Sequence, residues 1–386
     1  MRASRDWVRR NLGFDPIATP APAESFAHKV AASARAQPED FQREIIDFDS
    51  EGPEGAAFFA FSTATGLSRF TDIPWPKTLA PKSDSVARKG AGGALPKADV
   101  LVVTWTVDEG HALSRVLTPG KDSRNDYVPY RHNFAKISKK MRKGCPALQA
   151  GRLGAYWTTS IAGKKVVIFK SDSHLSQDVK RAPTPGQTLP NEDVWRQIIA
   201  EVNPALVITT GTAGGIGTQC EVGDVLVSRI VRFDCQNWLK KEPFATAVYR
   251  DGAVKTKYFA KARGLFKANS GQLPADNSRP PKIVVATKDD QAVLTTDFFG
   301  FDTSDDHWKL QGSGSVSEMG DAVLGRVSAA LPGPHWVAVR NVSDPQIKAE
   351  GTRKDQAKVA AQIYKGFGRW SSVCSAIACW ALIAAL

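Results

Sequence analysis

The chain has 386 residues, which is enough for one large domain with an extension or for two domains. Hydrophobic residues make up 42% and charged residues 23%, a balance that permits a sizeable core in a soluble protein. The formal net charge of +12 favours an anionic partner such as a nucleotide, although a basic surface that only maintains solubility is an equally good interpretation. The five cysteines form no CxxC pair and the six histidines no HExxH motif, which speaks against a disulfide scaffold and against a structural metal.

The first 96 residues have the composition of an accessory region. Short helices are expected near 7–12 and 24–35, and a linker rich in Pro, Gly and Lys is expected over 74–96. The arginines near the N-terminus are not followed by the apolar core of a secretory signal, and nearby acids weaken the alternative of an organelle transit peptide. We therefore expect a cytoplasmic protein with an N-terminal accessory region and linker at 1–96 and one further domain at 97–386.

From residue 98 onward, apolar strands alternate with helices, which indicates an α/β sheet covered on both faces. The apolar run at 371–386 is too short to span a membrane and predicts a buried terminal helix. A basic, aromatic insertion covers 124–145. The expected strands are 98–105, 166–170, 206–210, 224–231, 283–287 and 336–341, and the expected helices are 109–116, 194–202, 317–331 and one or two within 356–386.

The stretch VITTGTAGGIG at 207–217 is central to this pattern. An apolar strand leads into Thr210, Gly211 and Thr212, and three more glycines follow. Glycines permit positive φ and let the backbone approach a ligand closely, so we expect a tight turn that is either structural or binds a sugar or phosphate. The spacing is neither GxGxxG nor that of a P-loop, which disfavours dinucleotide and P-loop binding.

Acidic residues stand where the expected strands end, which is where ligands bind in open α/β sheets. Asp108 and Glu109 follow the first strand of the sheet, and Asp344 follows the last. Glu318 and Asp321 lie at the start of the helix that precedes the last strand. Acids that converge on one cleft suit cleavage of a glycosidic bond, because one can take a proton from water while another protonates the leaving group. Any one of them could equally be a turn residue or a charge at a helix start.

Four motifs, TTGTAGGIG, VGDVLVS, EMGDAV and RNVSD, occur in this order and together resemble the nucleoside phosphorylase/nucleosidase superfamily. The members that the chain most resembles are the methylthioadenosine/S-adenosylhomocysteine nucleosidases and the AMP nucleosidases. The resemblance covers 98–386 apart from insertions. It implies a three-layer α/β sandwich with a central mixed, partly barrel-like sheet flanked by helices, and it implies a homo-oligomer, a dimer or larger.

The resemblance also implies roles for individual residues. Glu109 matches the glutamate that activates the attacking water, with Asp108 as the fallback. Asp344 matches the aspartate that protonates the leaving purine at N7, and Arg340 and Ser343 occupy the matching positions of the same motif. The other residues expected to bind substrate are Thr210, Gly211 and Thr212 at the ribose or nucleophile, and Met319 beneath the ribose.

One position departs from the family pattern. The family usually has a glutamate directly after the methionine, where it holds the ribose hydroxyls, but this chain has Gly320 followed by Asp321. Either Asp321 performs this task from the next position or the sugar is held differently. Glu318 matches an acid that is also found in the family.

The expected base pocket lies in TTDFFGF, at 295–301. Aromatic residues of this region stack on the base in related enzymes, so Phe298 or Phe299 could do so here. Two adjacent phenylalanines are nevertheless more often part of a core. Asp297 is an additional polar candidate, and Asp234 matches an acid that follows the corresponding strand, where its role could be structural.

Two further segments could contact a ligand. Asp172 and His174 follow the strand at 166–170, although a lone histidine is more often structural. The lysines and arginine at 136–143 could bind the phosphates of a nucleotide or a nucleic acid. Because no RNP or helix-turn-helix context surrounds them, a solvated loop is the preferred interpretation and nucleic acid is not an expected partner.

The nucleophile can be inferred from the glycine stretch. Phosphorylases hold phosphate with arginines, one of them just before this loop, where the present chain has Thr209. A phosphate dianion needs charge-assisted donors, and this loop offers only hydroxyl and backbone N–H groups. We therefore expect hydrolysis of the N-glycosidic bond of a purine nucleoside or nucleotide, with adenine as the expected base and with no cofactor, metal or membrane partner. A phosphate-dependent phosphorylase and a non-catalytic nucleotide sensor are the alternatives.

Overall fold

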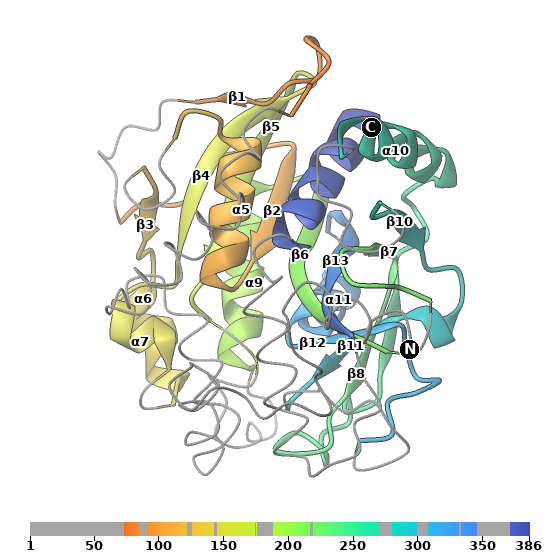
Figure 1. Ribbon diagram of the computed structural model, residues 1–386. Helices are drawn as coiled ribbons and strands as arrows, with labels where there is room; N and C mark the ends of the chain where they lie inside the picture. The colour runs from red at the N-terminus through yellow and green to blue at the C-terminus, as the bar shows by residue number, and fades with distance from the viewer. Residues whose placement is uncertain are drawn as a thin grey trace, which may run out of the picture.

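The computed structural model describes residues 73–84, 92–121, 126–142, 145–173, 175, 188–216, 219–270, 280–298, 308–331, 333–345 and 371–386. One mixed sheet runs through this part of the chain, and helices flank it (Figure 1). The predicted α/β sandwich with a mixed central sheet is confirmed, and the sheet does not close into a barrel.

The sheet contains thirteen strands among the described residues. Its main path runs β1-β4-β5-β2-β6-β12-β11-β8-β9, with β3 beside β4, β13 beside β6 and β7, and β10 beside β7. The strands are β1 (Lys82–Ser83), β2 (Val100–Thr104), β3 (Val128–Tyr130), β4 (Gly154–Ile161), β5 (Lys164–Ser171), β6 (Leu206–Gly215), β7 (Val225–Ser228), β8 (Ile230–Asp234), β9 (Val248–Arg250), β10 (Ile283–Val285), β11 (Val293–Thr296), β12 (Val316–Glu318) and β13 (His335–Pro345).

Helices cover both faces of the sheet. Val103 of β2 lines the same cavity as Val194 and Val323, whereas Thr104, the next residue of the strand, bonds to Glu109. Because successive side chains of a strand point to opposite faces, α9 and α11 cover one face and α5 the other. The helices are α5 (Val107–Leu117), α6 (Phe134–Ile137), α7 (Pro146–Ala150), α9 (Pro190–Val202), α10 (Thr256–Asn269) and α11 (Asp321–Ala330), with 3-10 turns η2 (Ser138–Lys140) and η3 (Asp289–Gln291).

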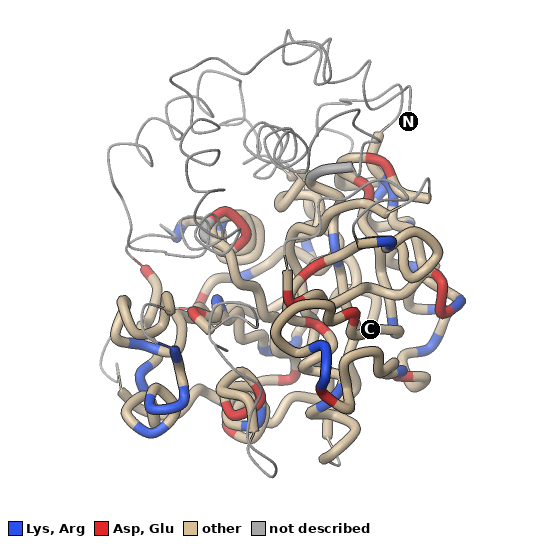
Figure 2. Tube along the Cα trace, turned by 90° about the horizontal axis from the view of Figure 1, so that it is seen from below, with Lys and Arg blue, Asp and Glu red and all other residues tan. Residues whose placement is uncertain are grey.

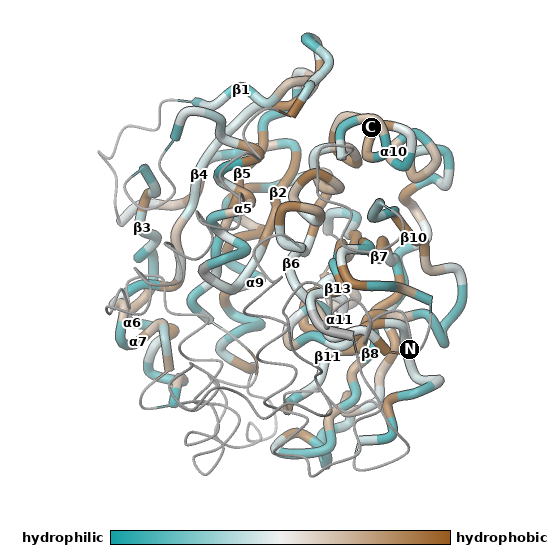
Figure 3. Tube along the Cα trace, viewed as in Figure 1, coloured by the Kyte–Doolittle hydropathy of each residue, from teal (hydrophilic) through white to brown (hydrophobic). Residues whose placement is uncertain are grey.

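The centre of the sheet is its most hydrophobic part (Figure 3). Every residue of β2 is buried, as is expected of a parallel strand with helices on both faces. β2 pairs in parallel with β5 on one side and with β6 on the other. The expected strands at 98–105 and 166–170 and the expected helices at 109–116 and 194–202 are confirmed with small changes in their ends.

The central glycine stretch differs from the prediction of a tight turn. β6 continues through Gly211, Gly214 and Gly215 instead of ending at Thr210. The strand stays paired because β13 runs alongside it in parallel from His335 to Pro345 and absorbs the irregularity with a register shift between Val342 and Asp344.

The second half of the chain shows further differences. The expected strand at 224–231 is two strands, β7 and β8, and the expected helix at 317–331 begins only at Asp321, because Val316–Glu318 form β12. Sequence analysis did not predict β4, β9, α10 or β11. The expected strands at 283–287 and 336–341 are confirmed as β10 and β13.

The end of the chain is a helix over 371–385 that is buried along its whole length, as predicted. A helix that is apolar on all sides is stable only inside a protein or a membrane. Here the Trp380 ring packs against Trp75 with centroids 4.2 Å apart and planes tilted by 52°, and Trp380 Nε1 donates to the Leu79 carbonyl at 2.7 Å. None of the described helices has the length and apolarity that crossing a bilayer requires.

The accessory region lies mostly outside the described residues. The helices expected at 7–12 and 24–35 lie outside the described residues. The first part, 356–370, of the helical segment expected at 356–386 also lies outside them. The boundary between 1–96 and 97–386 stays a prediction. Within the expected linker, β1 pairs with β4 and Trp75 contacts the C-terminal helix.

Candidate active site

Glu109 is positioned by the turn between β2 and α5. Thr106 caps α5 because its side chain accepts a hydrogen bond from the Glu109 amide. The Glu109 side chain in turn accepts one from the Thr106 amide, which completes a capping box. Glu109 Oε2 accepts hydrogen bonds from Thr104 Oγ1 at 2.7 Å, from the Thr106 amide at 2.8 Å and from the Trp105 amide at 3.1 Å. The carboxylate is buried and turned back over the carboxyl end of β2.

The other oxygen of Glu109 reaches the glycine stretch of β6. Oε1 accepts from the Thr212 amide and from Thr212 Oγ1, both at 2.7 Å. Gly211 has φ of +147°, and a Cβ atom on it would collide with the Glu109 carboxylate. Glycine at 211 is therefore needed both for its backbone conformation and for the close approach of Glu109.

Burial by itself would raise the pKa of Glu109, but the Arg340 guanidinium and the hydrogen bonds from Thr106, Thr212 and Thr104 outweigh burial and hold the pKa below its ordinary value. Glu109 is therefore an anion at neutral pH. Its partners are hydroxyl and backbone N–H groups that fix the position of both carboxylate oxygens.

Arg340 of β13 holds two further acids. Its Nε donates to Asp321 Oδ2 at 2.9 Å and its Nη2 donates to the other oxygen of Asp321 and, at 3.1 Å, to Glu318 Oε2. All three side chains are buried. The bidentate geometry toward Asp321 is the strong form of this ion pair.

Two carboxylates share one guanidinium in this cluster. Burial and the neighbouring Asp321 raise the pKa of Glu318 to about 8, although Arg340 and the hydrogen bonds from Thr295 and the Asp321 amide act in the opposite direction. Burial by itself would lower the pKa of Arg340. The neighbouring Asp321 and Glu318 raise it by more, so the net change is upward. Burial and the neighbouring acid therefore favour the protonated form of Glu318, while Arg340 stays a cation.

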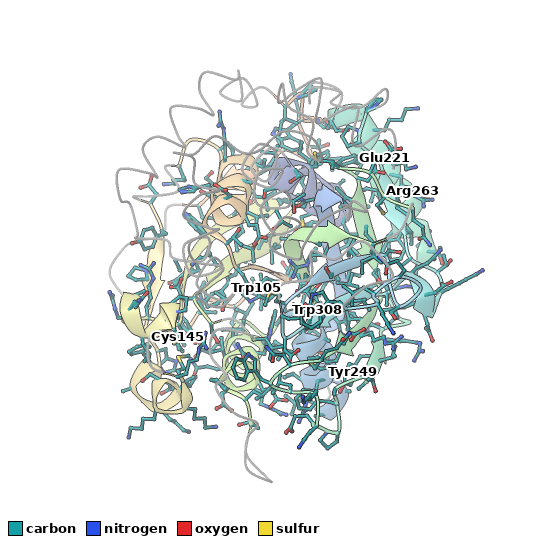
Figure 4. All side chains as sticks on the ribbon, turned by 60° about the horizontal axis from the view of Figure 1, so that its bottom comes forward. Trp105, Cys145, Glu221, Tyr249, Arg263 and Trp308 are labelled. Atoms are coloured by element: carbon teal, nitrogen blue, oxygen red, sulfur yellow. The ribbon has the colours of Figure 1, made fainter. Side chains whose placement is uncertain are left out.

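Trp105 packs over this cluster near the middle of the molecule, where Figure 4 labels it. The Arg340 guanidinium lies 4.7 Å from the centre of the Trp105 ring, a cation–π contact. A Cβ atom on Gly320 would come within 2.7 Å of the indole. The departure from the family pattern at 320 therefore has a steric reason, because Trp105 occupies the space of any side chain there. Both oxygens of Asp321 accept hydrogen bonds from Arg340, and a role of Asp321 in holding the ribose stays a prediction.

Gly320→Ala is expected to destabilise the protein by about 1–3 kcal/mol, because the added methyl group must displace the indole. The matched control is Gly264→Ala on α10, where a Cβ atom meets nothing within 4 Å. This control should gain about 0.5–1 kcal/mol, the usual benefit of alanine inside a helix. Urea unfolding of both variants measures the difference. Trp105→Phe should recover part of the loss when combined with Gly320→Ala, and equal stabilities for the two glycine variants would contradict the steric explanation.

Asp344 lies on β13 directly opposite Gly214 of β6, and its side chain is outside the described part. Ser343 is buried, and its Oγ donates to the Ala213 carbonyl at 3.4 Å. Met319 is buried between β12 and α11. β6 thus brings Thr210, Gly211 and Thr212 alongside the RNVSD segment, while Thr212 contacts Glu109.

The sequence of this chain matches the model of one protein family. The family model of the phosphorylase superfamily matches residues 127–369, more than half of the chain. The chain belongs to the phosphorylase superfamily. No curated protein matches this phosphorylase-superfamily sequence.

Solved structures resemble the phosphorylase-superfamily chain at low identity. One is the 5'-methylthioadenosine/S-adenosylhomocysteine nucleosidase of Neisseria meningitidis in complex with methylthio-immucillin-A, with 16% identity, TM-score 0.45, and coverage of 74% of this chain and 99% of that one. The nucleosidase of Colwellia psychrerythraea 34H in complex with adenine has 14% identity, TM-score 0.45 and coverage of 76% and 98%. Futalosine hydrolase of Helicobacter pylori has 14% identity, TM-score 0.46 and coverage of 74% and 97%.

The described side chains of the segment expected to form the base pocket contact other residues of this phosphorylase-superfamily protein. Phe298 stacks on Trp308 with ring centres 3.7 Å apart, and Phe299 is outside the described residues. Asp297 accepts from the backbone amides of Gln236, Asn237 and Leu239 at 2.7–3.2 Å and so fixes the loop after β8. Asp234 accepts from Gln236 Nε2 at 2.8 Å, and burial raises its pKa.

The other residues expected to contact a ligand have their own partners where the structure describes them. Asp172 accepts from Arg152 Nε at 2.7 Å and from Lys170, and all three are buried. His174 lies outside the described residues. The basic segment gathers on α6 and η2 at one side of the molecule (Figure 2), where Lys140 pairs with Asp193.

Sequence analysis missed three residues of the phosphorylase-superfamily site. Thr104 bonds Glu109, Trp105 covers Arg340, and Thr295 bonds Glu318 and the Ala322 amide. A tryptophan directly after a buried strand and a glycine at 320 were both visible in the sequence. The sequence does not show that the Trp105 ring fills the space beside Gly320, because this contact depends on which strand ends the fold brings together.

Proposed function

We propose that this protein hydrolyses the N-glycosidic bond of a purine nucleoside or nucleotide and releases the free base and ribose or phosphoribose. One observation carries the proposal. Thr212 of β6 binds the Glu109 carboxylate at 2.7 Å, and two residues further along the same strand Gly214 lies opposite Asp344. This backbone register, in which Asp344 is paired with the strand that binds Glu109, supports the proposal, and so does membership of the phosphorylase superfamily.

In the proposed reaction Glu109 is the general base and Asp344 the general acid. As water forms its bond to the anomeric carbon, Glu109 takes one of its protons, and the bond from that carbon to the purine nitrogen breaks. Asp344 gives its proton to the purine, which leaves as the neutral base. The lowered pKa of Glu109 keeps the carboxylate ready to accept a proton at neutral pH.

The charge around Glu109 supports water rather than phosphate as the nucleophile. Among the described residues Arg340 is the cation that lowers the pKa of Glu109, and it is already paired with Asp321 through two hydrogen bonds. The groups that bind the Glu109 carboxylate are hydroxyl and backbone N–H donors from Thr104, Thr106 and Thr212. Binding a phosphate dianion beside the Glu109 anion would require an additional cation.

The test is incubation of the purified protein with purine nucleosides and nucleotides, with and without inorganic phosphate, followed by chromatography. We expect free purine with adenine-containing substrates, at a rate that phosphate does not change, and ribose or ribose 5-phosphate as the second product. Release that depends on phosphate and yields ribose 1-phosphate would contradict hydrolysis. Tight binding without release from any substrate would contradict catalysis altogether.

A further inference from the structure

Helix α10 presents a strongly basic face to solvent. It packs on the protein through buried residues that include Phe259, Ala262 and Phe266. Half of its eight exposed residues are cations and none is an acid, and the exposed N-cap, Lys255, adds one more cation. Figure 4 labels Arg263 at the edge of the molecule, well away from Trp105. The eight exposed residues are Thr256, Lys257, Ala260, Lys261, Arg263, Gly264, Lys267 and Ala268.

The cations of α10 and Lys255 have no acidic partner among the described residues, and the exposed Lys136 and Lys139 share this property. Elsewhere on the surface, Arg250 pairs with Asp289 and Lys140 with Asp193. Within the described residues, no carboxylate forms an ion pair with any cation of α10 or with Lys255. The polar contact made by Lys261 is a 3.3 Å hydrogen bond to the Ala385 carbonyl at the end of the C-terminal helix.

Several of these charges destabilise helix α10. Lys257 and Lys261 are four residues apart, as are Arg263 and Lys267, and like charges at that spacing repel across one helical turn. Lys255 and Lys257 also stand at the positive end of the helix dipole, where acids are favourable, and the first turn contains no acid. Lys267 in the last turn is favourable to the dipole, so the conflict with local rules lies in the first turn and in the two like-charged pairs, and such a conflict is found at functional surfaces.

We propose that the exposed face of α10 binds the phosphate backbone of a nucleic acid. From Lys257 to Lys267 the face extends about 15 Å along the helix axis, and a duplex offers one negative charge about every 1.7 Å of its own axis. Exposed Ala260, Gly264 and Ala268 are small and let the backbone of the partner come close. An anionic membrane suits this face less well, because the apolar residues of α10 are turned into the protein and none is left to insert.

This inference differs from the sequence-based expectation that nucleic acid is not a partner. That expectation considered the basic segment at 136–143, whose Lys140 is paired with Asp193, and it did not include α10 because no helix was predicted there. The proposal is independent of the proposed N-glycosidase activity, since α10 contributes no residue to the candidate active site.

The test compares the full chain with the double variant Lys257→Glu/Arg263→Glu. Binding of fluorescein-labelled duplex DNA and of single-stranded RNA is followed by anisotropy over a series of salt concentrations. We expect the slope of log K against log salt to become shallower by about two, one for each lost phosphate contact. The thermal midpoint should stay the same or rise, because the new carboxylates face Lys261 and Lys267 one turn away. A larger effect on one nucleic acid identifies which type the face prefers.

The matched control is Lys136→Glu/Lys139→Glu on α6 and η2, two exposed lysines that give the same change in net charge. An equal loss of slope in this control would overturn the proposal in favour of overall charge. Absence of binding to both nucleic acids at low salt would also overturn it, as would binding to phosphatidylserine vesicles without binding to nucleic acid. If Lys257→Glu/Arg263→Glu unfolds, the neutral pair Lys257→Gln/Arg263→Gln must show the same loss of about two in slope.

Discussion

Glu109→Gln is expected to slow the release of free base by a factor of about 10²–10⁴, the usual contribution of a general base. Glutamine has one acceptor oxygen, whereas Glu109 uses both of its oxygens to accept hydrogen bonds from Thr212 and from the turn at Thr104 to Thr106. The amide NH₂ group must therefore face N–H or O–H donors on one side. We expect an accompanying loss of stability of about 1–3 kcal/mol, which is too small to unfold a typical domain.

The control for this variant is Asp108→Asn, at the neighbouring acid that sequence analysis kept as the fallback base. Asp108 is in the first turn of α5 and half-buried, while Glu109 is buried and bound to β6. Rates of base release at saturating substrate, together with the thermal midpoints, separate catalysis from folding. A large loss of rate in Asp108→Asn with full activity in Glu109→Gln would assign the base to Asp108 instead.

The dependence of the rate on pH gives a second measurement for Glu109. Its pKa lies below the ordinary 4.5, so the carboxylate loses its charge only when the pH falls through that lower value. We therefore expect the acidic limb of kcat/KM that belongs to Glu109 to lie below pH 4.5. The stability that the folded environment of this carboxylate contributes should be present above pH 4.5 and decline over the same acidic range.

Arg340→Met is expected to destabilise the protein by about 3–5 kcal/mol, the typical cost of leaving a buried charge without its partner. Asp321 would lose both hydrogen bonds to its carboxylate from Arg340, and Glu318 would lose one. The pKa values of the stranded carboxyls rise in the folded state, so the penalty is largest at neutral pH and shrinks as the pH falls toward their unfolded values. Urea unfolding at several pH values measures both the size and the sign of this effect.

The matched control is Arg250→Met, which also removes an arginine that pairs with an aspartate. Arg250 and Asp289 are more than half exposed, so water replaces the lost partner. We expect this variant to unfold at the same urea concentration as the natural protein at every pH. A similar loss in the two variants, or a penalty in Arg340→Met that grows as the pH falls, would contradict the buried-charge explanation.

The sequence predicted a strand correctly where one short run of residues is enough to identify it. The run at 98–105 has four consecutive apolar residues, 100–103, which predict a strand covered on both faces, and β2 is that strand. The same reasoning predicted β5, the start of β6 and β13. It failed for β11 and β12, which are three or four residues long, and for α10, where Gly264 and many cations interrupt the helical pattern.

The candidate site was predictable as a set of residues but not as a network. Glu109 and Asp321 were identified as acids near strand ends, but the two hydrogen bonds that Asp321 accepts from Arg340 were not predicted. Glu318 was expected at the start of a helix and lies in β12 instead. Such pairings depend on the order of strands in the sheet, and the spacing of residues along one chain does not contain that order.

The position of β6 has a consequence for biosynthesis. β2 is made before β6, but β13, which pairs with ten residues of β6 in parallel, is made only after the strands from β7 to β12, and the helix at 371–385 follows β13. Until then the nascent chain carries a long apolar strand with one unsatisfied edge, the kind of edge that recruits strands from other chains. Ribosomes that stall before residue 335 would therefore release aggregation-prone fragments, and efficient production would depend on chaperones that shield β6 until its last neighbour arrives.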